Sequence, residues 1–234
     1  MSGRPELAER LGAVRSRIAA AGGGDDVAIL AVTKGFGAEA VRAAQGVGLT
    51  AVGENYAQEL LAKAEELTGS EVPQFHFIGR LQRNKVRLLV PVVAVWQTVD
   101  RAELAGEIAR RAPGARVLVQ LNLSGEAQKG GCDPDDAEAL VEGCAALGLD
   151  VAGLMGVAPA GPPEAARPGF RRLVDLADRL GLPERSIGMS ADLEVAVQEG
   201  STMVRVGRDL FGPRPARPAP PSGGDPDGAG GGRR

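Results

Sequence analysis

The first regular pattern of hydrophobic and polar residues in this chain has the period of an α-helix. Residues 6–21 carry apolar side chains at intervals of four, three and four residues, and three glycines follow at 22–24. The apolar positions are Leu7, Leu11, Val14 and Ile18. This spacing places them on one face of a helix, and glycine is typical of a helix end. We therefore expect an amphipathic helix at 6–21.

After this helix, short apolar runs alternate with amphipathic segments. A short apolar run indicates a buried strand, whereas a 3.6-residue period indicates a helix. The expected strands are 27–33, 50–52, 74–78, 93–98, 117–123, 151–155, 186–188 and 203–206. The expected helices are 38–45, 58–67, 84–89, 102–111, 134–147, 163–180 and 191–199. We expect the Glu and Lys side chains of helix 58–67, Lys63 among them, on its exposed face.

Eight strands that alternate with helices predict a single α/β domain with a parallel sheet. Eight such units favour closure into a (β/α)8, TIM-type barrel with an extra N-terminal helix. A chain of 234 residues has the length of one such barrel. Because the seventh strand is weak, a doubly wound open sheet is the alternative.

The composition changes after Gly212. Residues 213–234 include six prolines, six glycines and almost no apolar side chains. Such a segment cannot bury enough apolar surface to offset the entropy of ordering it. We expect one folded domain at 1–212 and a disordered tail at 213–234, to which no function is assigned.

Composition excludes several classes of protein. A formal net charge of −3 argues against a nucleic-acid partner. No apolar run reaches the roughly 20 residues that span a membrane, and the chain begins without an apolar signal core. The chain has one histidine, His76, and its cysteines, Cys132 and Cys144, lack metal or redox spacing. We expect a cytoplasmic, monomeric, metal-free protein with reduced structural cysteines.

Lys34 is the first candidate for chemistry, because it ends the first apolar run. The chain has 23 arginines and only four lysines: Lys34, Lys63, Lys85 and Lys129. A lysine kept at a buried strand end indicates that an amine is needed, since a desolvated lysine can lose its proton and attack an aldehyde, whereas arginine cannot. The alternative is a lysine that reaches solvent at the strand end and only packs there.

A phosphate site is predicted beside Lys34. In barrels of this class, phosphate often binds in the loops after strands 7 and 8, which hold Ser190, Arg205 and Gly207. A hydroxyl at a helix start, a guanidinium and a glycine suit an oxyanion. Taken singly, Ser190 is as well read as a helix N-cap and Gly207 as a turn residue. Because strands 8 and 1 are neighbours in a closed barrel, a reactive amine would lie beside a phosphate, as in a pyridoxal phosphate (PLP) pocket.

Several segments carry a family resemblance. They read AVTKGF at 31–36, VGENYAQE at 52–59, FHFIGRLQRNK at 75–85, LVQLNLSGEAQKGG at 118–131, VAGLMGVAP at 151–159 and IGMSADLEVAVQEGSTMVRVGRDLFG at 187–212. In these segments the chain resembles the pyridoxal phosphate homeostasis protein family, also called the YggS/PROSC family.

The resemblance implies a single barrel similar to the N-terminal domain of alanine racemase, with PLP held as a Schiff base on Lys34. It assigns the phosphate to Ser190, Arg205 and Gly207, and places Asn55 near the cofactor. It also implies a secondary PLP contact at Lys129. The chain departs from the family pattern at Gly35-Phe36, at Arg185 in RSIGMS and at Arg208, and its tail has no family counterpart.

The resemblance implies PLP storage and delivery to PLP-dependent apoenzymes, with no catalytic turnover and no catalytic residue. A racemase needs a second acid–base group, and similar racemases take it from a second domain, which we do not expect here. One alternative is a racemase-like enzyme with Tyr56 or His76 as the second base. Another is a barrel that binds a different phosphorylated metabolite without a Schiff base.

Overall fold

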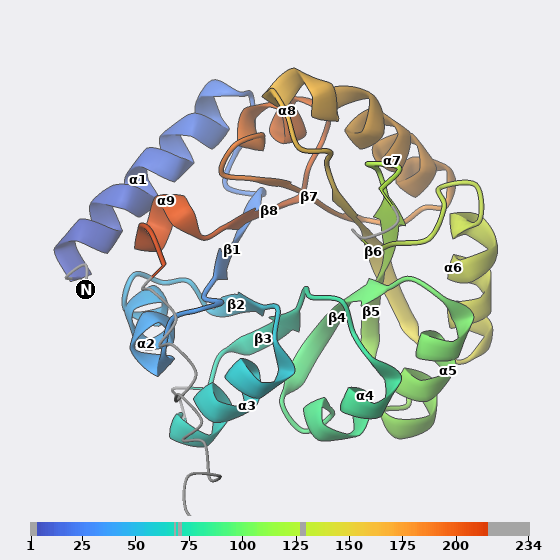
Figure 1. Ribbon diagram of the computed structural model, residues 1–234. Coiled ribbons are helices and arrows are strands. Elements are labelled where there is room, and N and C mark those ends of the chain that lie inside the picture. Colours follow the sequence, from blue (N-terminus) through green and yellow to red (C-terminus); the bar gives the residue numbers. More distant parts are fainter. Residues whose placement is uncertain (1–3, 68, 70–71, 127–129, 215–234) are drawn as a thin grey trace, which may run out of the picture.

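The computed structural model describes residues 4–67, 69, 72–126 and 130–214, and its core is a closed barrel of eight parallel strands (Figure 1). The strands are β1 (Ala28–Val32), β2 (Ala51–Glu54), β3 (Gln74–Phe77), β4 (Val93–Val99), β5 (Arg116–Asn122), β6 (Asp150–Val157), β7 (Glu184–Met189) and β8 (Met203–Val206). β1 pairs with β8 from Ala28↔Met203 to Ala31↔Val206, which closes the barrel. The predicted TIM-type barrel is confirmed, and the open sheet is excluded.

Helices surround the barrel. They are α1 (Arg4–Ala20), α2 (Ala38–Gly46), α3 (Ala57–Glu66), α4 (Arg83–Leu89), α5 (Ala102–Arg111), α6 (Ala137–Ala146), α7 (Arg167–Arg179), α8 (Leu193–Gln198) and α9 (Arg208–Phe211). The helix expected at 163–180 begins as a separate 3-10 turn, η3 (Pro163–Ala166). The extra N-terminal helix is confirmed as α1, which packs against α8 and α9 (Figure 1). No helix in the described ranges is long and apolar enough to cross a membrane.

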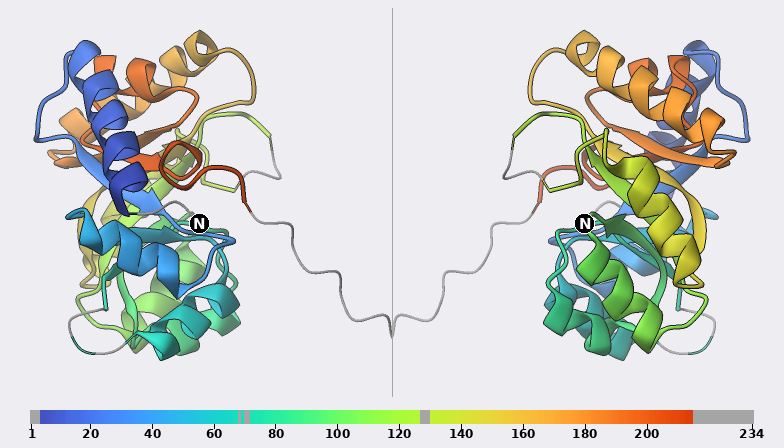
Figure 2. Two further views of the ribbon diagram at one scale, coloured as in Figure 1. Left: turned by 90° about the vertical axis from the view of Figure 1, so that its left-hand side faces the viewer. Right: turned by 90° about the vertical axis from the view of Figure 1, so that its right-hand side faces the viewer.

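The main apolar core lies between the helices and the barrel, where strand side chains alternate with those facing the barrel interior. A smaller apolar cluster is separate from it. Its members are Val95, Leu118, Ala152 and Met155. Polar side chains are also buried on the barrel strands, among them Gln97 on β4 and Arg205 on β8. The loops after β5 and β6 and the segment after β8 lie at one end of the barrel (Figure 2), which is where barrel enzymes and binding proteins place their sites.

Candidate functional site

A cavity of about 640 Å³ opens at the carboxyl ends of β1, β7 and β8. Residues at or after these three strand ends, one residue after β3, the first residue of α9 and the segment after α9 line it: Val32, Lys34, Phe36, Ile78, Met189, Ser190, Ala191, Arg205, Gly207, Arg208, Gly212, Pro213 and Arg214. Four of the predicted site residues, Lys34, Ser190, Arg205 and Gly207, therefore meet at one cavity.

Lys34 reaches this cavity because β1 ends in a tight turn. Strand side chains alternate in direction, so Val32 and Lys34 face the cavity, while the Thr33 hydroxyl points the other way and donates to Oε1 of Glu54. The N–H of Phe36 donates to the carbonyl of Thr33 at 3.1 Å. Gly35, the third residue of this turn, has a φ of +79°, which only glycine adopts at little cost. The glycine after Lys34, a departure from the family pattern, thus fits the local backbone.

The surroundings of Lys34 favour its neutral amine. Burial lowers the pKa of Lys34, and the positive charges of Arg214 and Arg205 lower it further. The carboxylates of Glu54 and Glu59 oppose this shift without reversing it. A larger fraction of the Lys34 side chain is therefore unprotonated at neutral pH than in an ordinary lysine, which is the form that attacks a carbonyl carbon.

Hydrogen bonds to groups of the barrel strands fix the side chain of Arg205. Its guanidinium donates to the carbonyl and the hydroxyl of Ser186 and, at 2.7 Å, to the carbonyl of Gly156. Burial lowers the pKa of Arg205 to about 10, so the group is still positively charged at neutral pH. Because it also lines the cavity, Arg205 places a fixed positive charge there.

A chain of hydrogen bonds continues from Arg205 through the barrel interior. The Ser186 hydroxyl donates to Oε1 of Gln97 at 2.8 Å, and Nε2 of Gln97 donates to Nδ1 of His76 at 2.7 Å. Burial lowers the pKa of His76 to about 4, so the imidazole is neutral in the folded protein. This histidine is a satisfied interior residue and does not line the Lys34 cavity.

His76 makes folding stability depend on pH. Between its folded pKa of about 4 and its ordinary value of 6.5, the unfolded chain binds a proton that the folded protein does not. The free energy of unfolding should therefore fall as pH falls through this window, by on the order of 3 kcal/mol at its lower end. Urea unfolding at several pH values should show this slope in the wild type and lose it in His76→Asn. Equal slopes would contradict it.

Ser190 brings an unsatisfied hydroxyl to the cavity. It does not begin a helix, as the sequence suggested, because α8 starts at Leu193 with Asp192 at its N-cap. Asp192 turns back and accepts the N–H of Met189 at 2.6 Å. Ser190 is thus free of a capping role, and its Oγ is buried with no hydrogen-bond partner in the described residues. A buried hydroxyl in this state suits an acceptor supplied by a ligand.

Gly207 is needed where β8 passes β1. A Cβ at this position would lie 3.1 Å from the carbonyl oxygen of Val32, tighter than ordinary contact. The glycine therefore lets the loop after β8 approach the end of β1, close to Lys34.

Asn55 lies apart from the other predicted site residues. It lines a neighbouring cavity of about 780 Å³ at the ends of β2 to β5, together with Tyr56, Lys85 and Arg101. The structure therefore does not bring Asn55 to the cavity of Lys34. Lys129, the predicted secondary contact, lies outside the described residues.

The structure describes the first two residues of the predicted tail, and both lie at the Lys34 cavity. Pro213 and Arg214 line the Lys34 cavity, and Cδ of Arg214 would lie 3.1 Å from a Cβ at Gly35. These two residues form part of the site, whereas the remainder of the predicted tail, 215–234, lies outside the described residues.

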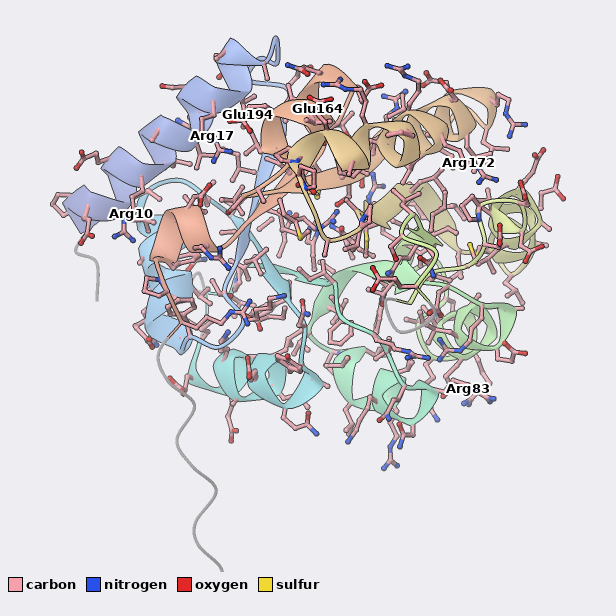
Figure 3. All side chains as sticks on the ribbon, turned by 45° about the horizontal axis from the view of Figure 1, so that its top comes forward. Arg10, Arg17, Arg83, Glu164, Arg172 and Glu194 are labelled. Carbon is pink, nitrogen blue, oxygen red and sulfur yellow. The ribbon has the colours of Figure 1, made fainter. Side chains whose placement is uncertain are left out.

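Arg17 connects α1 to both loops that follow β7 and β8. Its guanidinium donates to the carbonyl of Ser190 at 2.8 Å and pairs with the carboxylates of Glu194 and Asp209. Figure 3 shows Arg17 on α1 beside Glu194. One side chain of the extra helix thus holds the loop of Ser190 and the helix that follows Gly207, and sequence reasoning missed it.

Arg17→Ala should loosen both loops together. We expect amide hydrogen exchange at 189–192 and 207–210 to rise about tenfold, since removing one partner of a charge-assisted network costs over 1 kcal/mol. Exchange in α5, on another part of the barrel, should not change. Faster exchange in only one of the two loops would contradict a shared attachment.

Lys63 is the second residue that sequence reasoning missed. It was expected on the exposed face of α3, but its side chain is only 3% exposed and faces the strands. Its Nζ pairs with Oε1 of Glu54, which also accepts the hydroxyl of Thr33. The use of lysine in a chain that otherwise uses arginine singles out Lys34, and the same observation would also have singled out Lys63.

The residues described hold no group of three or more His, Cys, Asp or Glu side chains placed to bind a metal ion. The Lys34 cavity offers an amine, a hydroxyl and guanidinium groups.

Comparison with known proteins places the chain in a family. Residues 6–215 match the family model described as alanine racemase, N-terminal domain. The pyridoxal phosphate homeostasis protein of Aquifex aeolicus is 41% identical over 223 residues, which cover 88% of this chain and 97% of that protein. The protein of the same name from Pseudomonas aeruginosa is 41% identical over 222 residues, covering 89% and 96%.

Solved structures agree with this placement. The structure of PipY from Synechococcus elongatus, with PLP bound, matches with a TM-score of 0.77 and 33% sequence identity. The match covers 88% of this chain and 100% of that chain. The recognition made from sequence motifs is thereby confirmed.

Proposed function

This chain belongs to the pyridoxal phosphate homeostasis protein family, and on that premise we propose that it binds PLP on Lys34, stores it and releases it to PLP-dependent apoenzymes in the cytoplasm. The observation that carries the proposal is one cavity lined by a half-buried lysine with a lowered pKa, a fixed guanidinium and a buried hydroxyl that has no partner among the described residues. Relatives named pyridoxal phosphate homeostasis proteins, and the PipY structure with PLP bound, support it.

The cavity residues fit PLP in both charge and chemistry. The neutral amine of Lys34 would hold PLP covalently through its aldehyde carbon, with the loss of one water molecule. The Ser190 hydroxyl can donate to a phosphate oxygen, and Arg205 supplies positive charge beneath it. Bound in this way, PLP would contribute a reactive aldehyde held in covalent form and kept away from other amines.

The arrangement favours storage over catalysis. Racemisation needs a second acid–base group within reach of the substrate. His76 is buried on β3 with its Nδ1 bonded to Gln97, and the low pKa of its imidazole keeps it neutral. Tyr56 is 48% exposed and lines the neighbouring cavity. Neither candidate second base lines the Lys34 cavity, so the racemase-like alternative lacks a partner group for Lys34.

Two measurements test the proposal. Titration of the purified protein with PLP should give the visible absorbance of a protonated Schiff base at one equivalent. Amino acids incubated with the PLP-loaded protein in deuterated water should exchange their α-protons far more slowly than about 1 per second, a rate within the usual range of enzyme turnover. Absence of the absorbance would contradict PLP binding, and rapid exchange would contradict storage without turnover.

A further inference from the structure

The turn that carries Lys34 is held by one face of α3. Glu59 and Lys63 are four residues apart, so both lie on the same side of this helix. Oε2 of Glu59 accepts the N–H of Gly35 at 2.8 Å, and Nζ of Lys63 donates to the carbonyl of Thr33 at 2.7 Å. The backbone groups immediately before and after Lys34 are thus both bonded to α3.

A third residue fixes Lys63 in place. Glu54, at the end of β2, is fully buried, and its Oε1 binds both Nζ of Lys63 and the hydroxyl of Thr33. Burial raises the pKa of Glu54, while Lys63 and Thr33 lower it by binding its charged form. We call Glu54, Glu59 and Lys63 the turn clamp.

None of the three clamp residues lines the Lys34 cavity. Glu59 and Lys63 bond to the backbone of the turn. The carboxylates of Glu54 and Glu59 also stabilise the protonated amine of Lys34. Small displacements of a reacting group slow its reaction strongly, by up to about 100-fold for 1 Å. A turn fixed on both sides keeps the amine in one place relative to the phosphate site.

We propose that the turn clamp positions Lys34 for covalent attachment of PLP, with Glu59 and Lys63 as positioning residues on the two sides of the turn. This inference rests on the proposed function only in naming PLP as the aldehyde. The clamp itself is a property of the protein alone, and can be measured without the cofactor.

The clamp can be tested with matched variants of α3. Glu59→Ala removes the acceptor for the Gly35 N–H, Glu59→Gln keeps an amide oxygen there, and Glu65→Ala changes an exposed glutamate of the same helix. In the PLP-free protein, hydrogen exchange at the Gly35 amide should rise about tenfold in Glu59→Ala. It should stay within about twofold of the wild type in the other two variants. Unchanged exchange in Glu59→Ala would overturn the clamp.

Positioning can then be separated from binding. Borohydride trapping over time at saturating PLP should show attachment to Lys34 slowed about tenfold in Glu59→Ala and restored in Glu59→Gln. The affinity for pyridoxine 5′-phosphate, which has an alcohol in place of the aldehyde, should not change. Equal attachment rates in Glu59→Ala and wild type would overturn the positioning role, as would a slow Glu59→Gln. Failure of the wild type to attach PLP would instead contradict the proposed function, and the Gly35 exchange result would still decide the clamp.

Discussion

Lys34→Arg and Lys34→Ala should both lose covalent attachment of PLP completely. Arginine keeps the positive charge but cannot supply a neutral amine, so the pair of variants separates charge from nucleophilicity. Ser190 and Arg205 would still face the phosphate, and weak binding should persist. We expect affinity to fall on the order of 100-fold in both variants, which corresponds to about 2.7 kcal/mol. Absorbance of the Schiff base and equilibrium dialysis measure the two effects separately.

Lys85→Ala is the matched control for these variants. Lys85 lines the neighbouring cavity with Asn55, and its removal leaves the Lys34 cavity intact. Its absorbance titration should match that of the wild type. A Schiff base that is retained in Lys34→Ala and lost in Lys85→Ala would place the reactive amine in the neighbouring cavity. It would contradict the assignment of PLP to Lys34.

Lys63→Met should destabilise the fold strongly. The change removes the partner of Glu54, whose carboxylate is fully buried, and an uncompensated buried charge costs about 3–5 kcal/mol. Part of this cost is avoided if Glu54 takes up a proton, a change that its raised pKa favours. Urea unfolding measures the free energy of unfolding. Glu65→Ala, on the exposed face of α3, should change it by less than about 0.5 kcal/mol.

The double variant Glu54→Gln/Lys63→Met tests the cause of this loss. With both charges removed, stability should return to within about 1.5 kcal/mol of the wild type, because a neutral pair pays no cost of buried charge. The glutamine can still accept the hydroxyl of Thr33. A double variant as unstable as Lys63→Met alone would show that loss of the hydrogen bond from Nζ of Lys63 to the carbonyl of Thr33, and not the unpaired charge of Glu54, destabilises this region.

The barrel could be predicted from sequence because its signal is local and repeated. Each apolar run marked a strand, and the structure closes β1 against β8, as the count of eight favoured. Element ends were less accurate. The start of α8 depends on Asp192 bonding to the N–H of Met189, a choice between neighbouring polar residues that periodicity does not reveal.

Of the five residues predicted at strand ends, the structure brings four to one cavity and Asn55 to another, and the residues that act from helices were missed. Lys34, Ser190, Arg205 and Gly207 share a cavity because barrel topology brings the ends of β1, β7 and β8 together. Arg17 reaches the loops after β7 and β8 from α1, and Lys63 reaches the turn after β1 from α3, both through contacts distant in sequence.

The interior polar chain from Arg205 to His76 was also missed. It joins residues of three strands, Arg205, Ser186 and Gln97, before it reaches the histidine on β3. Alternation along a strand indicates which side chains point inward, but it does not indicate which of them bond to one another. The sequence therefore leaves His76 as a candidate second base. Its bond to Gln97 and its lowered pKa are seen only in the structure.

The most direct test of PLP storage on Lys34 is the position of the trapped adduct. The purified protein is incubated with one equivalent of PLP, reduced with borohydride, digested, and mapped by mass spectrometry. The pyridoxyl group is expected on the peptide containing Lys34, with at most trace labelling of the other three lysines. An adduct distributed over Lys63, Lys85 and Lys129, or absent from Lys34, would contradict storage of PLP on this residue.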